Sequence, residues 1–285
     1  MNHEFTLNFN LVLASDPTGV IGNNNDLPWG HGELTGDLKR FRQLTDGKIV
    51  LMGSNTYRSL PTYPKGLPGR LNIVVSSSFS LEHDLNELSV VGNLLHSLDE
   101  DVDTNNFVIG DNVIIFQNEW RHAHSQEPLN IHETANVKNL ILKIWEWHKA
   151  SPQSAIVKSK VIDNKVIVEP IEIMVIGGSK LYDSFLYIAQ KNELISGSLS
   201  NGNALHPYTA IVNRLKNIHF TLTKKLYKGN TSSIMAKSII RSLIYKDRKF
   251  SECNWNISKE THEAMQSHVN FDLEISQSLS SLIQK

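Results

Sequence analysis

The segment Ile171–Tyr182 (IEIMVIGGSKLY) decides the fold. Residues 171–176 are mostly apolar, as in a strand that is buried on both faces of a parallel sheet. Gly177 and Gly178 follow at once, and a helix is predicted from Lys180 to about 189. Paired glycines let a ligand approach the backbone, and a helix N-terminus offers free N–H groups to a phosphate. The pattern predicts either a ligand-binding turn or a plain strand-to-helix turn, because it is not a complete GxGxxG motif.

The same arrangement recurs earlier in the chain. Residues 49–52 (IVLM) form a second apolar run that ends at Gly53, and a helix is predicted over 54–60. Further apolar strands are expected at 7–14 and 72–76. Strands that alternate with helices predict an α/β fold with parallel pairs, whose ligands lie at the carboxyl ends of the strands. Two such turns together therefore favour a ligand site.

The remaining pattern completes a single predicted domain over residues 1–285. It has no Pro/Gly/Ser linker and no repeat. We expect a core of 5–78, 171–228 and 268–277, with insertions at about 79–170 and 229–267. The other expected elements are a helix from Thr35, a helix over 136–149, a hairpin over 156–168 that turns at Asp163-Asn164, a strand near 194–199, a strand over 218–226, a helix over 234–244 and a strand over 269–275.

Composition excludes several classes of function. A formal net charge of −1 gives no electrostatic reason to expect nucleic acid or an anionic membrane as a partner. With one cysteine, Cys253, neither an intramolecular disulfide nor a thiolate metal cage is possible. The histidines, His122 and His124 included, lack metal-ligand spacing, so we expect no metal. The N-terminus lacks the pattern of a secretory signal and no apolar run is long enough to span a bilayer, so a cytoplasmic location is expected.

Asp37 is the first candidate for chemistry. It lies in the first turn of the helix that Thr35 is expected to cap, after a loop that carries Leu27 and Trp29. A carboxylate held among apolar side chains resists ionisation, which suits a group that binds a protonated heterocycle and helps to deliver a proton. A helix-capping or solvated aspartate is the alternative. Arg70, just before a buried strand, is suited to holding a carboxylate.

Read in order, these elements resemble the dihydrofolate reductase family, and their compact spacing is similar to its bacteriophage-type members. The resemblance implies a mixed, mostly parallel central sheet flanked by helices, with inserted segments. The matching pieces are Val20-Ile21-Gly22, Asn25-Asp26-Leu27-Pro28-Trp29, Asp37-Leu38-Lys39-Arg40-Phe41, Val50-Leu51-Met52-Gly53, Thr56-Tyr57-Arg58-Ser59-Leu60, Leu67-Pro68-Gly69-Arg70, Asn72-Ile73-Val74-Val75-Ser76-Ser77 and Ile173 to Tyr182.

The resemblance also implies roles for individual residues. Asp37 would bind the pteridine ring and promote protonation at N5 while hydride passes from NADPH to C6 of dihydrofolate, under a mobile loop, 22–29, that carries Leu27 and Trp29. The implied substrate-binding residues are Ala14, Asp37, Leu38, Phe41, Leu60, Leu67, Arg70 and Ile176. The implied cofactor-binding residues are Ala14, Ile21, Gly22, Gly53, Ser54, Thr56, Ser76, Ser77, Ser78, Ile176, Gly177, Gly178, Ser179, Lys180, Leu181 and Tyr182.

The chain departs from the family pattern at three places. Ser54 stands where many members have a basic residue that contacts the 2′-phosphate, so NADPH selectivity would rest on Ser77, Ser78 and Lys180. Three extra residues before Asp37 make Glu33 a rival acid. The strand at 194–199 has no clear Thr to support the acid, and neither Ser196 nor Ser198 is assigned that role.

The expected product is tetrahydrofolate, which would supply one-carbon metabolism and thymidylate synthesis. The expected ligands are dihydrofolate and antifolates such as methotrexate or trimethoprim. The chain would be a monomer or homodimer in the cytoplasm, or in the host cytoplasm if it is viral. Two alternatives stay open, a riboflavin-pathway pyrimidine reductase and a binding or structural protein on a reductase scaffold. The long insertions motivate the second of these.

Overall fold

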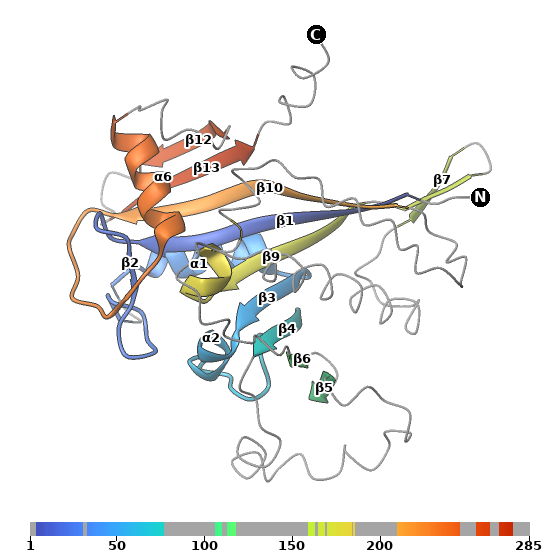
Figure 1. Ribbon diagram of the computed structural model, residues 1–285, viewed down its shortest axis with the longest axis horizontal. Coiled ribbons are helices and arrows are strands. Elements are labelled where there is room, and N and C mark those ends of the chain that lie inside the picture. Colours follow the sequence, from blue (N-terminus) through green and yellow to red (C-terminus); the bar gives the residue numbers. More distant parts are fainter. Residues whose placement is uncertain are drawn as a thin grey trace, which may run out of the picture.

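A computed structural model describes eleven separate parts of the chain (Figure 1). Most of them belong to one sheet with helices on its two faces. The described residues are 4–30, 33–76, 106–109, 113–117, 159–162, 165–168, 170–183, 185, 210–245, 255–262 and 268–275.

Nine strands form the central sheet. Five neighbouring pairs in its middle are parallel, and the pairs toward its two edges are antiparallel. The predicted mixed, mostly parallel α/β sheet is therefore confirmed. In spatial order the strands are β12 (Trp255–His262), β13 (His268–Ile275), β10 (Ala210–Thr223), β1 (Glu4–Ser15), β9 (Ile171–Gly177), β3 (Ile49–Gly53), β4 (Leu71–Ser76), β6 (Val113–Gln117) and β5 (Asn106–Ile109).

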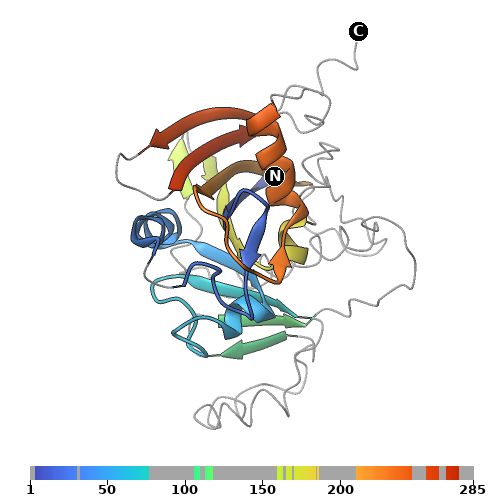
Figure 2. The same cartoon turned by 90° about the vertical axis from the view of Figure 1, so that its left-hand side faces the viewer.

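Continuous apolar runs form the middle of the sheet because these strands are covered on both faces. In β3 and β9 nearly every side chain is buried. Helix α1 (Thr35–Thr45) lies on one side of the sheet and α6 (Ile234–Tyr245) on the other, as Figure 2 shows. Two apolar clusters result. Phe41 and Leu44 of α1 pack on the first, and Met235, Ala236 and Ile239 of α6 are fully buried in the second.

Several expected elements are confirmed, with shifted ends. The hairpin is present as β7 (Ser159–Ile162) and β8 (Lys165–Val168). The helix expected over 54–60 is α2 (Ser54–Arg58), and the strand expected over 218–226 is the end of β10. Thr35 does not cap α1: the cap position is Leu34, which makes no side-chain capping bond and is instead buried. The expected helix at 136–149 and strand at 194–199 lie outside the described residues.

Four short pieces of the structure were not expected from the sequence. Strands β5 and β6 come from the predicted insertion 79–170, and β12 comes from the predicted insertion 229–267. The fourth piece is a small antiparallel pair, β2 (Val20–Gly22) with β11 (Thr231–Ser232), which joins two distant loops. Both predicted insertions therefore supply strands to the main sheet.

Helix α6 should be essential for stability. Ile239 is fully buried in the core cluster, so Ile239→Ala removes apolar contacts and leaves a cavity. Such truncations cost about 2–5 kcal/mol of the free energy of unfolding. Ile234→Ala, at an exposed position of the same helix, is the matched control and should change stability by no more than about 0.5 kcal/mol. Chemical denaturation of both variants measures the difference; equal losses would show that α6 does not pack as described.

Candidate active site

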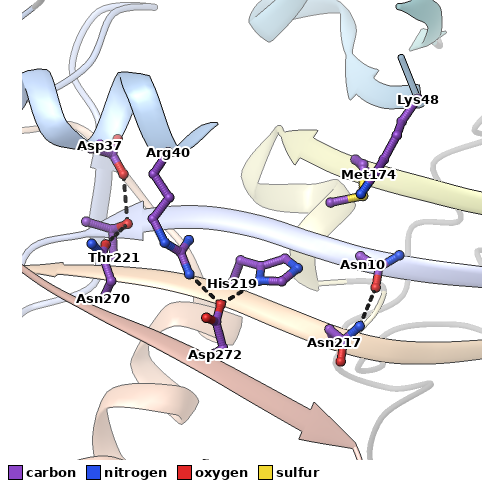
Figure 3. Close-up of polar contacts among 10 residues, drawn as sticks. All are labelled: Asn10, Asp37, Arg40, Lys48, Met174, Asn217, His219, Thr221, Asn270 and Asp272. Atoms are coloured by element: carbon purple, nitrogen blue, oxygen red, sulfur yellow. Dashed lines mark hydrogen bonds and ion pairs between the residues drawn. The ribbon is translucent and has the colours of Figure 1, made fainter. Parts of the chain in front are cut away.

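Asp37 lies on α1 above the ends of β10 and β13. The hydroxyl of Thr221 donates a hydrogen bond to Asp37 Oδ1 at 2.7 Å, and it lies 2.9 Å from Asn270 Oδ1 (Figure 3). A hydroxyl carries one proton, so its donation to Asp37 leaves its own oxygen free to accept. The strand pair β10–β13 therefore holds one carboxylate oxygen and fixes the direction in which the other points.

Burial dominates the electrostatics of Asp37. It raises the pKa of this carboxyl above its usual value, because removal from water disfavours the charged form. The Thr221 hydrogen bond and the positive charges of His268 and Arg40 oppose that rise without cancelling it. A carboxyl with a raised pKa keeps its proton to a higher pH than an ordinary aspartate does, and it can pass that proton to a bound base.

Among the described residues, Thr221 supports the acid, and the strand expected at 194–199 lies outside them. Thr221 lies directly opposite Ala14 in the parallel pair of β1 and β10. The available signal was the alternation of polar and apolar residues over 218–223, which puts Thr221 on the opposite face from Phe220. The sequence could not show that β10, rather than an earlier strand, pairs with β1.

Glu33, the rival acid, is engaged elsewhere. Its Oε1 accepts hydrogen bonds from Lys225 Nζ at 2.7 Å and from the Tyr227 hydroxyl at 2.9 Å. These contacts lower the pKa of Glu33, and its carboxylate lies in solvent, so it is a poor proton donor. The same carboxylate, together with burial, raises the pKa of Tyr227 to about 12. Glu33 thus links the start of α1 to the segment after β10.

The loop at 22–30 is held by that same segment. Trp29 is buried and packs edge-on against Tyr227, with ring centroids 5.6 Å apart. The Asn230 side chain accepts from the Asn24 backbone N–H at 3.0 Å and donates to the Asn24 side chain at 2.8 Å. None of these contacts was predicted from the sequence, because they join residues about 200 positions apart.

The apolar residues predicted to bind substrate gather on the α1 face of the sheet. Phe41, Leu60 and Leu67 pack against the apolar cluster that includes Ile176 near the end of β9. Leu38, the neighbour of Asp37, is 41% exposed. Leu27 is half-buried in the loop before α1. The structure therefore places an exposed apolar side chain beside the half-buried acid.

The two strand-to-helix turns meet at their glycines. A Cβ on Gly177 would lie 2.4 Å from Thr56 Cγ2, and Gly178 has a φ of +100°, which favours glycine. A Cβ on Gly53 would lie 3.9 Å from the Gly178 Cα. Gly177 therefore has no room for a side chain next to Thr56 of α2, whereas a Cβ on Gly53 or Gly178 would make only ordinary van der Waals contact with the facing turn.

Other residues predicted to bind a cofactor fall into two groups. Ser54, Thr56 and Ser179 are half-buried at the turns, and Lys180 is exposed there. Leu181 and Tyr182 are buried in the core on the α6 side, where Ile21 also packs. The hydroxyl of Tyr182 donates to the Val12 carbonyl at 2.7 Å. Burial raises the pKa of that hydroxyl. Ser76 is buried at the end of β4, while Ser77 and Ser78 lie outside the described residues.

Arg70 is a buried guanidinium. Its Nε donates to Thr45 Oγ1 at 2.9 Å and one of its terminal nitrogens donates to the Pro68 carbonyl at 2.8 Å. Burial lowers the pKa of Arg70, and the charge of Asp46 opposes that effect. Arginine stays charged in proteins, and these two bonds hold its plane in place while leaving N–H groups for an anion.

Two further observations concern only the part of the chain that the structure describes. It contains no group of three or more His, Cys, Asp or Glu side chains placed to hold a metal ion. None of its helices is both long and apolar enough to cross a bilayer.

Fold and site together define a class: an open, mostly parallel α/β sheet whose ligand site lies at the carboxyl ends of its strands. Residues 8–161, more than half of the chain, match the family model described as dihydrofolate reductase. The chain belongs to the dihydrofolate reductase family.

Curated relatives match over a shorter stretch. The dihydrofolate reductase of Mycobacterium leprae is 50% identical over 66 residues, which are 23% of this chain and 38% of the relative. The type 8 dihydrofolate reductase of Escherichia coli is 49% identical over 65 residues, 23% of this chain and 36% of the relative. The aligned part thus spans less than two-fifths of either relative. A solved structure, dihydrofolate reductase from Enterococcus faecalis complexed with NADP(H) and RAB-propyl, is 13% identical with a TM-score of 0.46, covering 94% of this chain and 96% of that one.

Proposed function

We propose that this protein reduces 7,8-dihydrofolate to 5,6,7,8-tetrahydrofolate with NADPH. The observation that carries the proposal is the half-buried Asp37 carboxyl, whose pKa is raised by loss of solvation and whose one oxygen is fixed by Thr221. Family membership supports the reaction class. The product would feed one-carbon metabolism and thymidylate synthesis, and a cytoplasmic location remains the expectation.

In this mechanism Asp37 binds the pterin ring and promotes protonation at N5. Thr221 holds the carboxyl in place, and the exposed Leu38 beside it offers an apolar surface to the ring. Trp29, buried against Tyr227, holds the loop at 22–30, which precedes the start of α1 and would exclude water from the site. Arg70 would bind the α-carboxylate of the substrate's glutamate tail, since its remaining N–H groups suit a planar anion.

The glycine turns fit a dinucleotide. Gly53, Gly177 and Gly178 leave backbone where side chains would otherwise stand, and Ser179 begins a helix whose N–H groups suit a phosphate. NADPH bound there would supply the hydride. Lys180 is exposed beside the turn, and its positive charge would favour NADPH over NADH by pairing with the 2′-phosphate. Ser54 offers a hydroxyl where a basic residue would add charge.

The test is a spectrophotometric assay at 340 nm with purified protein and dihydrofolate, run in parallel with NADPH and NADH. We expect oxidation of NADPH that depends on dihydrofolate. Oxidation only with the pyrimidine substrate of riboflavin synthesis would support that alternative instead. Absence of turnover together with no binding of methotrexate or trimethoprim would favour a scaffold protein and contradict the proposal.

Arg70→Gln should weaken substrate binding more than it slows turnover. Hydrogen bonds to charged groups contribute about 1.5–3 kcal/mol, so the KM for dihydrofolate should rise about 10- to 100-fold while kcat changes little. The KM for NADPH should stay the same. Arg58→Gln, an exposed arginine on α2, is the matched control. If kcat falls and the KM for dihydrofolate does not change, Arg70 is not the carboxylate ligand.

A further inference from the structure

Asp37 and Arg40 lie three residues apart on α1, a spacing that puts two side chains on the same helix face. An oppositely charged pair at this spacing normally forms an ion pair. Here the two side chains point to the same strands but bind different partners (Figure 3). The Arg40 guanidinium binds Asp272 Oδ1, while Asp37 binds Thr221.

Two cross-strand pairs create this separation. In the antiparallel ladder of β10 and β13, Thr221 lies opposite Asn270 and His219 lies opposite Asp272. The first pair lies under Asp37, and the second lies one helical turn further along, under Arg40. The His219 ring nitrogen Nδ1 is 2.6 Å from the same Asp272 oxygen that binds Arg40. Asp272 therefore binds side chains from two different elements, Arg40 of α1 and His219 of β10.

The contacts of Asp272 keep its carboxylate ionised at neutral pH. Arg40 and His219 together lower the pKa of this carboxyl more than its partial burial raises it. Its side chain is 29% exposed, whereas those of Arg40 and His219 are 17% and 16% exposed. The carboxylate thus stays ionised at neutral pH and remains a ligand for the guanidinium.

Contact between Arg40 and Asp37 would change the acid. A guanidinium paired directly with a carboxylate lowers the pKa of that carboxyl by about 1–3 units. The charged or titratable groups that face Asp37 from the described elements are Arg40 of α1, His268 of β13 and Tyr182 of the helix after Gly178. Among these, Arg40 is the permanent cation and lies on Asp37's own helix face.

We propose that Asp272 is a positioning residue for Asp37: it holds the Arg40 guanidinium on β13, one turn from Asp37, and so prevents that guanidinium from pairing with the Asp37 carboxylate. The catalytic consequence rests on the proposed function, because only a reaction that needs a protonated Asp37 is affected by it. The charge arrangement itself does not depend on the substrate.

The direct test is an NMR titration of the Asp37 carboxyl in ¹³C-labelled protein without ligands. In Asp272→Asn, Arg40 loses its carboxylate partner and should turn to Asp37, so the pKa of Asp37 should fall by at least about one unit. At pH values well above the pKa of Asp37, each unit of that fall would reduce the protonated fraction about tenfold. Asp272→Glu, which keeps the charge, should retain the wild-type titration.

The double variant Arg40→Gln/Asp272→Asn separates repositioning from simple loss of charge. It lacks the competing guanidinium, so the pKa of Asp37 should return to at least the wild-type value. A fall of less than half a unit in Asp272→Asn, or no recovery in the double variant, would overturn the proposal. If Asp272→Asn does not fold, a crystal structure of the double variant Arg40→Lys/Asp272→Ser is the replacement test. The Lys side chain introduced at position 40 should then contact the Asp37 carboxylate. A structure in which its ammonium group lies away from Asp37 would overturn the proposal.

Activity provides the second readout. Asp272→Asn should lower kcat about tenfold at neutral pH, with recovery at lower pH and an unchanged KM for NADPH, and the double variant should regain the rate. A general loss of packing would not move the pH profile in this way. Altered titration of Asp37 in a protein with no dihydrofolate turnover would contradict the proposed function and leave this inference standing.

Discussion

Asp37→Asn should reduce the rate of dihydrofolate reduction at neutral pH by about 100- to 10,000-fold, the contribution typical of a positioned acid. The amide keeps the shape of the carboxyl and can still meet Thr221, but it cannot promote protonation at N5. The loss should fall mainly on kcat, and it should shrink as the pH is lowered and solvent supplies the proton. Stopped-flow measurement of hydride transfer over a range of pH measures this effect. An unchanged rate would disprove the assignment of Asp37.

The same variant should be more stable than the parent at neutral pH. Burial raises the pKa of folded Asp37 above its unfolded value. Below the unfolded pKa both states are protonated and burial has no electrostatic cost. As the pH rises through the unfolded pKa, the unfolded state ionises first and the folded state loses stability until the folded pKa is passed. Asn carries no such cost, so its stabilising effect should appear only above the unfolded pKa. Glu33→Gln is the control carboxylate and should retain turnover.

Gly177→Ala should weaken cofactor binding at least tenfold. The new Cβ would lie 2.4 Å from Thr56 Cγ2, 2.5 Å from Thr56 Oγ1 and 2.9 Å from Thr56 Cβ, so either α2 or the end of β9 must move. Overpacking of this kind costs about 1–3 kcal/mol, and here the displaced atoms belong to the turn proposed to bind the nucleotide. We expect at least a tenfold rise in the Kd of NADPH, measured by fluorescence titration.

Two variants control this experiment. Gly53→Ala places a methyl group on the facing turn, where the nearest atoms lie 3.9 Å away and φ is −78°, so the protein should fold normally. Thr56→Ala in the Gly177→Ala background removes the two nearest atoms and should recover part of the affinity. If Gly177→Ala binds NADPH as tightly as the parent, the glycine turn is not the cofactor site.

Local sequence patterns predicted the middle of the fold well. The apolar runs that end at Gly53 and Gly177 are the buried parallel strands β3 and β9, and the helix after Trp29 carries Asp37 to the sheet. These features depend on periodicity, on glycine conformation and on the order of the motifs. A single sequence records all three.

Long-range pairing could not be predicted in the same way. Thr221 supports Asp37 only because β10 pairs with β1, and the sequence does not specify which late strand takes that place. The contacts of Glu33 and Trp29 with Tyr227 likewise depend on how a distant segment returns to the loop. Strands β5 and β12 are short or polar, so alternation did not distinguish them from loops.

The capping of α6 has a consequence for attempts to shorten this chain. Asp183, just after the glycine turn, accepts hydrogen bonds from the Ser233 hydroxyl at 2.7 Å and the Met235 backbone N–H at 3.0 Å, and so joins the first turn of α6 to the helix that follows β9. Deleting residues 229–245 to match the size of compact relatives would therefore leave Asp183 without these two donors and remove the buried side chains of α6 from the core. A shorter version of this protein therefore has to keep α6 and lose residues elsewhere.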